Sequence, residues 1–348
     1  MGKNERRFSM KTCFGTLPGG KEASLYTITG GGLTAVVTDL GATLVKLFVP
    51  DADGNLADVV LGHDTPDDYL RSTCFFGATV GRSANRIGGA SFELNGRTYT
   101  MTPNENGNNL HSGPDFYHAR LWTVLSHTES AITLELFSPH GDQGFPGNAT
   151  IHVTYSLDSE GGLHIVYDGI CDQDTVFNLT NHSYFNLAGH ENPAAAMDQL
   201  LMMPARFFNP DDAESIPTGE LRSVADSPMD FRTPKAIGQD IGADYDALNL
   251  QGGYDHNWEV FCNPCAILQD TVSGRTMAVY TDCPGVQFYA GNFLNNEPGK
   301  GGMVYPKRSA ICLETQFYPD SIHHPDWPQP ITKAGEPYHS ETVYRFSR

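Results

Sequence analysis

The sequence predicts an all-β protein, a large antiparallel β-sandwich with few short helices. Three observations favour this fold. Short segments of alternating apolar and polar residues recur along the 348 residues, they are separated by Gly, Asn, Asp and Pro, and patterns of helical period are scarce. Hydrophobic residues make up 39% of the chain, enough for a substantial core.

Two segments predict β-hairpins directly. Residues 91–100 alternate around Asn95-Gly96, a pair that adopts the two positive φ angles of a type I′ turn. Residues 151–157 alternate in the same way, and the turn signal 159–162 leads into a returning strand at 163–167. We therefore read most of the 36 glycines and 22 prolines as turn residues.

The chain lacks a composition break, a charged linker or an internal repeat, so we expect residues 1–348 to form a single domain. Residues 192–246 are rich in Pro, Asp and Ala, and we expect long loops or short helices there. Long loops often carry functional residues.

The charge excludes some classes of partner. Lys and Arg total 22 against 41 Asp and Glu, a formal net charge of −19 that repels phosphate backbones and anionic membranes. We expect no nucleic-acid partner and no membrane association, because no apolar run approaches the roughly 18 residues of a membrane span. Met1 to Lys11 shows no secretion signal, so a cytoplasmic protein, monomeric or homodimeric, is expected.

The seven cysteines favour reduced, mostly buried thiols over a disulfide framework, because the count is odd and the residues are scattered. Cys262 and Cys265 form the single close pair, but no second Cys or His pair at zinc-site spacing lies nearby. The adjacent His323 and His324 suggest a metal site only weakly. We expect no metal and no cofactor.

Several motifs of common enzyme classes are absent from the sequence: the Walker loop, the G-x-G-x-x-G fingerprint, the H-E-x-x-H pair and the G-x-S-x-G elbow. Polar and aromatic clusters occur inside strand-like segments instead. They are Gly81–Ile87, Asn109–His111, Asn178–Asn186, Gly253–Asn257, Gly285–Asn292 and Cys312–Gln316.

These clusters predict a polar cleft that binds carbohydrate. A sandwich interior normally excludes such residues, because an unpaired buried polar group costs roughly 1–3 kcal/mol. Amides, Arg, His, carboxylates and aromatic rings are the groups that a sugar requires, since each hydroxyl both donates and accepts and the C–H faces lie on aromatic rings.

The six clusters, in this order, resemble the motif series of the aldose 1-epimerase (galactose mutarotase) family. Further segments are similar to family landmarks over nearly the whole chain: 58–62, 141–147, 304–307 and 335–338. The resemblance implies the large antiparallel β-sandwich of that family. It also implies an isomerase that interconverts the α and β anomers of free aldohexoses, such as galactose and glucose, without a cofactor.

Carried over by motif, the resemblance implies that His182 in Thr-Asn-His-Ser-Tyr is the general acid and Glu314 in Cys-Leu-Glu-Thr-Gln the general base. It also implies a set of residues that line the sugar site. These are Asn85, Arg86, His111, Tyr184, Asp255 and Gln287. Arg82 does not match the ligand position.

The sequence departs from the family pattern in two places. Ser112 stands where the family usually has Gly, which could alter sugar preference, and Phe116-Tyr-His118 replaces the commoner Phe-Asp-Lys. Neither departure touches the two catalytic matches.

Mutarotation needs one acid and one base. A proton leaves the anomeric O1 hydroxyl while another reaches the ring oxygen O5, the C1–O5 bond opens, and reclosure after rotation about C1–C2 reverses the transfers. We expect Glu314 as carboxylate and His182 as imidazolium near neutral pH, and a bell-shaped pH dependence. We expect His111 and Arg86 to contact hydroxyls or O5, and Asp255 to orient the ring.

Other interpretations stay open from the residues alone. Glu314 lies among apolar residues and can be a buried carboxylate paired with Arg86, Asn85 and Gln287 can be structural amides, and Tyr184 can belong to the core. The rival functions are a non-catalytic carbohydrate-binding or sugar-sensing module, a sugar-phosphate 1-epimerase, which needs an Arg or Lys cluster, and a glycosidase, which needs two catalytic carboxylates.

Overall fold

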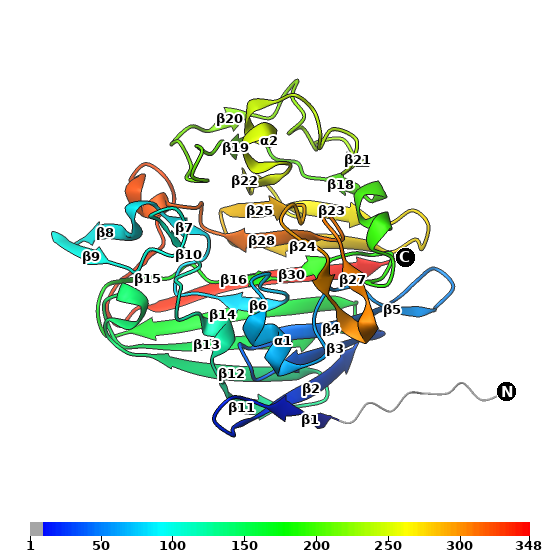
Figure 1. Cartoon of the computed structure of the whole chain (residues 1–348), viewed down its shortest axis with the longest axis horizontal. Helices are drawn as coiled ribbons and strands as arrows, with labels where there is room; N and C mark the ends of the chain where they lie inside the picture. The colour runs from blue at the N-terminus through cyan, green and yellow to red at the C-terminus, as the bar shows by residue number, and fades with distance from the viewer. Residues whose placement is uncertain (1–9) are drawn as a thin grey trace.

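The computed structural model describes residues 10–348. The first nine residues of the segment Met1 to Lys11 therefore lie outside the described residues. Strands dominate, and the predicted antiparallel β-sandwich is confirmed (Figure 1).

The largest sheet has nine strands, and neighbouring strands run antiparallel. Its strands, in spatial order, are β11 (Thr123–His127), β12 (Ala131–Ser138), β13 (Ala149–Leu157), β14 (Gly162–Cys171), β30 (Pro337–Ser347), β24 (Thr276–Thr281), β23 (Ala266–Gln269), β18 (Leu200–Met202) and β21 (Lys235–Ala236). Strand β30, from the end of the chain, lies between β14 and β24. Segments far apart in sequence therefore share one sheet, which supports the prediction of a single domain.

Two further sheets complete the sandwich. The six-stranded sheet has the order β17 (Tyr184–Phe185), β28 (Ile311–Gln316), β25 (Gly285–Tyr289), β22 (Asp255–Glu259), β19 (Phe207–Asn209) and β20 (Arg222–Ser223). The five-stranded sheet has the order β1 (Lys11–Thr16), β2 (Glu22–Gly30), β3 (Leu33–Thr38), β4 (Thr43–Pro50) and β5 (Leu56–Asp58). In Figure 1, β11 to β14 lie in the lower half of the view and β28, β25 and β22 lie above them.

Five short two-stranded ribbons lie outside the three large sheets in residues 10–348. They pair β6 (Ala78–Val80) with β16 (Thr180–His182), β7 (Arg86–Ile87) with β10 (Asn109–Leu110), β8 (Ser91–Leu94) with β9 (Arg97–Thr100), β15 (Thr175–Val176) with β29 (Ile331–Thr332), and β26 (Glu297–Pro298) with β27 (Val304–Tyr305).

One apolar core joins the three large sheets. Alternation along β13 buries every second residue, so that Ile151, Val153 and Tyr155 face inward while their neighbours are partly exposed. Val37 of β3 and the fully buried Trp258 of β22 belong to the same core. Leu179, directly before β16, and Leu313 of β28 also belong to this core, which therefore anchors both strands.

Both predicted hairpins are confirmed. Strands β8 and β9 flank Asn95 and Gly96, whose φ angles of 54° and 72° are those of a type I′ turn. Strands β13 and β14 pair from Ala149 opposite Cys171 to Leu157 opposite Leu163, across the turn that follows Leu157.

Helices are few and short, as predicted. In the described part of the chain, the two α-helices are α1 (Pro66–Arg71) and α2 (Asp246–Gln251), and the 3₁₀ helices are η1 (Gly88–Ala90), η2 (Tyr117–Ala119), η3 (Asp142–Gly144), η4 (Pro193–Asp198), η5 (Lys300–Gly302) and η6 (Ser321–His323). Helix α1 begins where Thr65 accepts a hydrogen bond from Asp68 N at 3.2 Å, with Pro66 in the first turn.

The stretch 192–246 is irregular, as expected, although it also contributes the short strands β18 to β21. The thiols follow their prediction too: all seven cysteines are free, five are buried, and Cys13 and Cys262 are exposed. Within residues 10–348, no helix has the length and apolar character needed to cross a membrane.

Candidate active site

Four polar side chains of the six-stranded sheet and its neighbour β16 converge because of strand register. Glu314 of β28 lies opposite Gln287 of β25, and Gln287 lies opposite Asn257 of β22. Asp255 is two residues from Asn257, so its side chain points to the same face of the sheet. His182, the last residue of β16, reaches this face beside Glu314.

The predicted catalytic residues come together. His182 Nε2 lies 3.7 Å from Glu314 Oε1, and both side chains are almost completely buried. At this separation neither atom satisfies the other with a hydrogen bond. Glu314 Oε2 is buried without a hydrogen-bond partner. One imidazole and one carboxylate thus face each other with unused hydrogen-bonding capacity.

The imidazole of His182 is held on several sides. Its ring stacks on Tyr184 at a centroid distance of 5.1 Å and on Phe75 at 5.8 Å. Its second nitrogen, Nδ1, lies 3.5 Å from Cys312 Sγ. Because the ring is fixed between two aromatic rings and a thiol, Nε2 is the nitrogen that can exchange a proton beside Glu314.

A cavity of about 620 Å³ opens onto this pair. Seven of the eight site residues named from the sequence line it: Asn85, Arg86, His111, His182, Tyr184, Asp255 and Glu314. Gln287 lies behind the wall, where its amide donates to Asp255 Oδ1 at 2.9 Å. It therefore acts on the cavity through Asp255.

Arg86 pairs with a residue that the sequence analysis did not single out. Its Nε and Nη2 donate to Glu105 Oε2 at 2.5 Å and Oε1 at 3.0 Å. The alternative in which Arg86 is the ion-pair partner of Glu314 is therefore wrong: the ion pair of Arg86 is with Glu105.

Asn85 and His111 form a reciprocal loop contact at the cavity wall. Asn85 N donates to His111 Nδ1 at 3.1 Å, and His111 N donates to Asn85 O at 2.8 Å. Because Nδ1 accepts a hydrogen bond, the proton of the neutral ring resides on Nε2, which can donate to a sugar oxygen. Asn85 Oδ1 accepts from Arg86 N at 2.9 Å, so Asn85 also has a structural role.

Burial controls the protonation of the pair. Burial raises the pKa of Glu314 well above its usual range, Asp255 raises it further, and Arg86 opposes both. Burial lowers the pKa of His182 to about 4, against the effect of its own backbone carbonyl. The expectation of an imidazolium at His182 near neutral pH is therefore wrong, and desolvation shifts Glu314 toward its protonated form.

Burial also shifts the pKa values of other cavity residues toward their neutral forms. Burial lowers the pKa of His111 well below its usual value, and His182 and Arg86 add to the effect. Burial also lowers the pKa of His118 to about 4 and raises the pKa of Asp255, which Arg86 and Gln287 oppose. Near neutral pH the three histidines at this cavity are neutral donors or acceptors.

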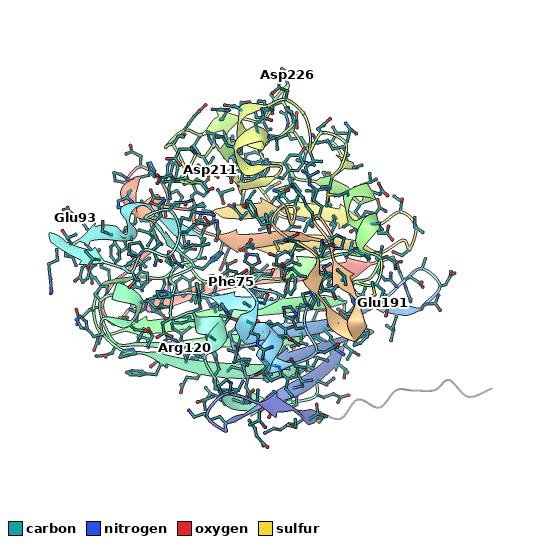
Figure 2. All side chains as sticks on the ribbon, in the orientation of Figure 1. Phe75, Glu93, Arg120, Glu191, Asp211 and Asp226 are labelled. Carbon is teal, nitrogen blue, oxygen red and sulfur yellow. The ribbon has the colours of Figure 1, made fainter. Side chains whose placement is uncertain are left out.

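The sequence analysis missed an aromatic wall. Phe75 contacts the rings of His111, Phe116 and His118 at centroid distances of 4.7–5.2 Å, and it stacks on His182. Figure 2 shows Phe75 near the middle of the molecule. The signal was the pair Phe75-Phe76 directly before the Gly81–Ile87 cluster, but an aromatic pair in a β-protein is usually core.

The two departures from the family pattern have different positions. The Ser112 hydroxyl donates to Ser83 O and accepts from Ser83 N, both at 2.9 Å, so its hydrogen bonds are structural. Its φ of 58° explains why Gly suits this position. His118, in contrast, lines the cavity.

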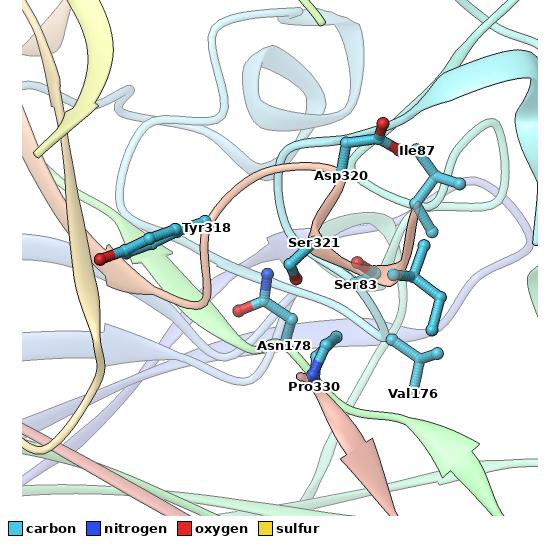
Figure 3. Close-up of a pocket in the computed structure, with 9 residues that line it drawn as sticks. Ser83, Ile87, Val176, Asn178, Tyr318, Asp320, Ser321 and Pro330 are labelled. Carbon is cyan, nitrogen blue, oxygen red and sulfur yellow. The ribbon is translucent and has the colours of Figure 1, made fainter. Parts of the chain in front are cut away.

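One of the smaller cavities has too little space for a sugar. Figure 3 shows this cavity of about 10 Å³, lined by residues such as Ser83, Asn178 and Ser321. A space of this size holds at most one water molecule. Arg82, which does not match a ligand position, is buried apart from the main cavity and donates to Ser138, Pro146 and Thr175.

One group of three potential metal-binding side chains occurs within residues 10–348. Donor atoms of His182, Cys312 and Glu314 lie within 4.8 Å of one another. The two ring nitrogens of His182 face different partners, Cys312 and Glu314, and one ion can bind only one of them. The arrangement fits proton transfer better than metal binding.

The comparisons with known proteins agree with this geometry. The family model described as aldose 1-epimerase matches residues 24–345. The chain belongs to the aldose 1-epimerase family.

Similar members of the family cover nearly the whole chain. Galactose mutarotase of Mus musculus is 39% identical over 97% of this chain and 98% of its own length, and aldose 1-epimerase of Escherichia coli is 35% identical over 94% and 96%. Among solved structures, the aldose epimerase homologue from C. elegans superposes with a TM-score of 0.86 at 33% identity, covering 94% of this chain and 99% of that one. Galactose 1-epimerase from Lactobacillus acidophilus superposes with a TM-score of 0.84 at 28% identity, covering 97% and 98%.

Proposed function

We propose that this enzyme, an isomerase, interconverts the α and β anomers of free aldohexoses such as galactose and glucose. One observation carries the proposal. Glu314 and His182 face each other across 3.7 Å in a sugar-sized cavity, and Glu314 Oε2 is buried without a partner. Leaving a carboxylate oxygen unpaired is unfavourable unless a ligand hydroxyl completes it.

We assign proton transfer to these two side chains. Glu314 removes the proton of the O1 hydroxyl while His182 Nε2 delivers one to O5, and the C1–O5 bond breaks to give the aldehyde. Rotation about C1–C2 presents the other carbonyl face. In reclosure, O5 loses its proton to His182 as it attacks C1, and Glu314 returns a proton to O1, so the enzyme ends in its starting state.

The sugar itself adjusts the protonation of the pair. In the empty cavity, burial favours a protonated Glu314 and a neutral His182. A hydroxyl that donates to Glu314 stabilises its carboxylate, and a sugar oxygen that accepts from Nε2 stabilises the imidazolium. The pair then holds the same single proton, transferred from the carboxyl to the imidazole.

We propose that the remaining wall orients the sugar. Arg86, His111 and Asp255 present donors and an acceptor to hydroxyls, Gln287 fixes Asp255, and Tyr184 fixes the ring of His182. Phe75 offers an aromatic face to the C–H side of the pyranose.

The charge of the wall disfavours a sugar phosphate. Four acidic side chains, Glu105, Asp255, Glu297 and Glu314, line the cavity with Arg71 and Arg86, and Glu105 neutralises Arg86. A phosphate site requires free cations. The presence of both acid and base disfavours a module that only binds sugar.

The test is the rate of mutarotation of freshly dissolved α-D-galactose and α-D-glucose, followed by polarimetry. We expect catalysis by the wild type, and a loss of about 10²- to 10⁴-fold in kcat for Glu314→Gln and His182→Asn. Glu93→Gln is a matched control, because Glu93 is an exposed glutamate in the β8–β9 hairpin, at the outer edge of Figure 2. A wild-type protein that binds galactose but leaves the rate unchanged would establish the binding module instead.

We further propose a cytoplasmic location and a monomer or homodimer. The free cysteines support a reducing compartment, because five of them are buried without forming disulfides. Cell fractionation and the mass measured by light scattering test these two proposals.

A further inference from the structure

Arg86 is a buried cation surrounded by acidic groups. Its side chain is 10% exposed; burial opposes its charge, but Glu105, Asp255 and Asp211 raise its pKa above the usual value. Glu105 makes the contact ion pair, with Nε and Nη2 of Arg86 donating to its two oxygens. Such a bidentate pair fixes the plane of the guanidinium as well as its position.

The backbone of Glu105 is fixed independently of its carboxylate. Glu105 and Asn108 exchange two backbone hydrogen bonds, of 3.2 Å and 2.7 Å, around Asn106 and Gly107, whose φ angles are 49° and 84°. These are the features of a type I′ turn. The loop therefore keeps its fold without help from the charge of Glu105, and the carboxylate is available for another role.

Glu105 also belongs to the cavity. It lines the same space as His182 and Glu314, and its side chain is 29% exposed. A carboxylate has about four lone-pair positions, so the two hydrogen bonds from Arg86 leave acceptor capacity for a sugar hydroxyl. The pair also leaves Nη1 of Arg86 as a donor.

We propose that Glu105 is a positioning residue of the sugar site, an inference that rests on the proposed function. It holds the Arg86 guanidinium so that Nη1 donates to a sugar oxygen, and it keeps this cation from pairing with Glu314. Without Glu105, Arg86 turns toward the remaining carboxylates and neutralises the base.

The charges around Glu314 determine how a loss of the Glu105 charge changes the pKa values of the cavity carboxyls. The titratable and charged groups that face Glu314 from the surrounding elements are Arg86, Asp255, His182, Cys312, Tyr184 and Tyr344. Arg86 lowers the pKa of Glu314, and Glu105 itself raises the pKa of Asp255. Removing the charge of Glu105 therefore lowers the pKa of Asp255 directly, and it lowers the pKa of Glu314 only if the released Arg86 moves closer to that carboxyl.

The experiment compares Glu105→Gln with the wild type and with Glu93→Gln. In Glu105→Gln we expect KM for galactose to rise about tenfold. We expect the alkaline limb of kcat/KM to move down by about one pH unit. Glu105→Asp, which keeps the charge, should recover most of the pH profile. A role limited to loop stability would lower Tm and leave the pH profile in place.

A second measurement separates this inference from the proposed function. The ¹³C NMR chemical shift of the Glu314 carboxyl reports the pKa of this group in the ligand-free protein, whether or not the protein is active. The signal is assigned by its loss in Glu314→Gln. We expect a decrease of about one unit in Glu105→Gln. An unchanged pKa, or an unchanged KM and pH profile in an active enzyme, overturns the role of Glu105, whereas an inactive wild type with the decreased pKa overturns only the proposed reaction.

Discussion

The cavity has two sides that are built in different ways. On one side, Glu314, Gln287 and Asp255 come from neighbouring strands, and pairing register alone sets their spacing. On the other side, Phe75, Asn85 and His111 lie in connections with φ angles of 58°, 57° and 51°. Non-glycine residues seldom adopt this region, so each needs specific contacts to hold it there.

The difference separates two tasks. The sheet positions Glu314, Gln287 and Asp255 rigidly, because shifting a strand by one residue would turn every side chain to the opposite face. The loop side supplies aromatic and hydrogen-bonding contacts, from residues such as Phe75, His111 and His118. We expect the strand side to govern chemistry and the loop side to govern sugar binding.

The largest effect outside the catalytic pair should come from Phe75 on the loop side. Phe75→Ala removes a ring that contacts His111, His118 and His182. We expect kcat/KM to fall about ten- to hundredfold, mainly through KM, because the sugar loses its aromatic face. Polarimetry over a range of galactose concentrations measures both constants.

Phe261→Ala is the control for Phe75, since that ring is 55% exposed and does not line the cavity. Phe75→Tyr should keep most of the activity. If Phe75→Ala lowers kcat alone, the ring serves to hold His182 rather than to bind sugar, and the division between the two sides fails.

The pH dependence tests the strand side. The working pair carries one proton, so activity falls when a second proton binds His182 and when Glu314 loses its own. Because burial lowers the pKa of His182 to about 4 and raises that of Glu314, we expect a broad bell whose acid limb lies near pH 4. Values of kcat/KM, corrected for spontaneous mutarotation, measure this profile.

An acid limb near pH 6.5 would mean that burial does not govern His182 in the free enzyme. Far-UV circular dichroism at each pH distinguishes titration of the pair from acid unfolding. Glu93→Gln should give the wild-type profile.

The two sides also differ in how far the sequence predicts them. Alternation and turn residues were enough for the sandwich and both hairpins, because period-2 burial is a local property. Strand-borne Glu314 was singled out because Cys-Leu-Glu-Thr-Gln resembles a family motif, whereas its apolar neighbours alone left a buried structural carboxylate open. Glu105 and Phe75 were missed because a glutamate before Asn-Gly and a phenylalanine pair look like ordinary surface and core residues.

The protonation state of His182 was also predicted wrongly from the sequence. The expected imidazolium rested on the free pKa of histidine and a neighbouring carboxylate, whereas the depth of burial around His182 decides the direction of the shift. The His182 ring is buried by strands β16 and β28 and by Phe75. These segments lie far apart in the chain, so no local sequence pattern reveals the burial of His182.

A moderate effect is expected from Gln287, on the strand side but behind the cavity wall. Gln287→Leu removes the donor to Asp255 Oδ1, and the pKa of Asp255 then rises further because Gln287 opposes the effect of burial. We expect KM to rise about three- to tenfold with little change in kcat. Gln269→Leu, an exposed glutamine of β23, is the matched control, and a tenfold loss of kcat in Gln287→Leu would place Asp255 in the chemistry.

The smallest effect should come from Ser112, on the loop side but outside the cavity lining. Ser112→Gly relieves a φ of 58° but leaves buried Ser83 N without its partner, so we expect a net loss of about 1 kcal/mol in the free energy of unfolding. The ratio of kcat/KM for galactose to that for glucose should stay within about twofold of the wild type, because the hydroxyl bonds to Ser83 and not to the sugar. Polarimetry on both sugars and thermal unfolding measure these quantities. A changed ratio would mean that backbone strain at Ser112 alters the position of the neighbouring His111. The loop side would then set sugar preference through its backbone as well as through the side chains that face the cavity.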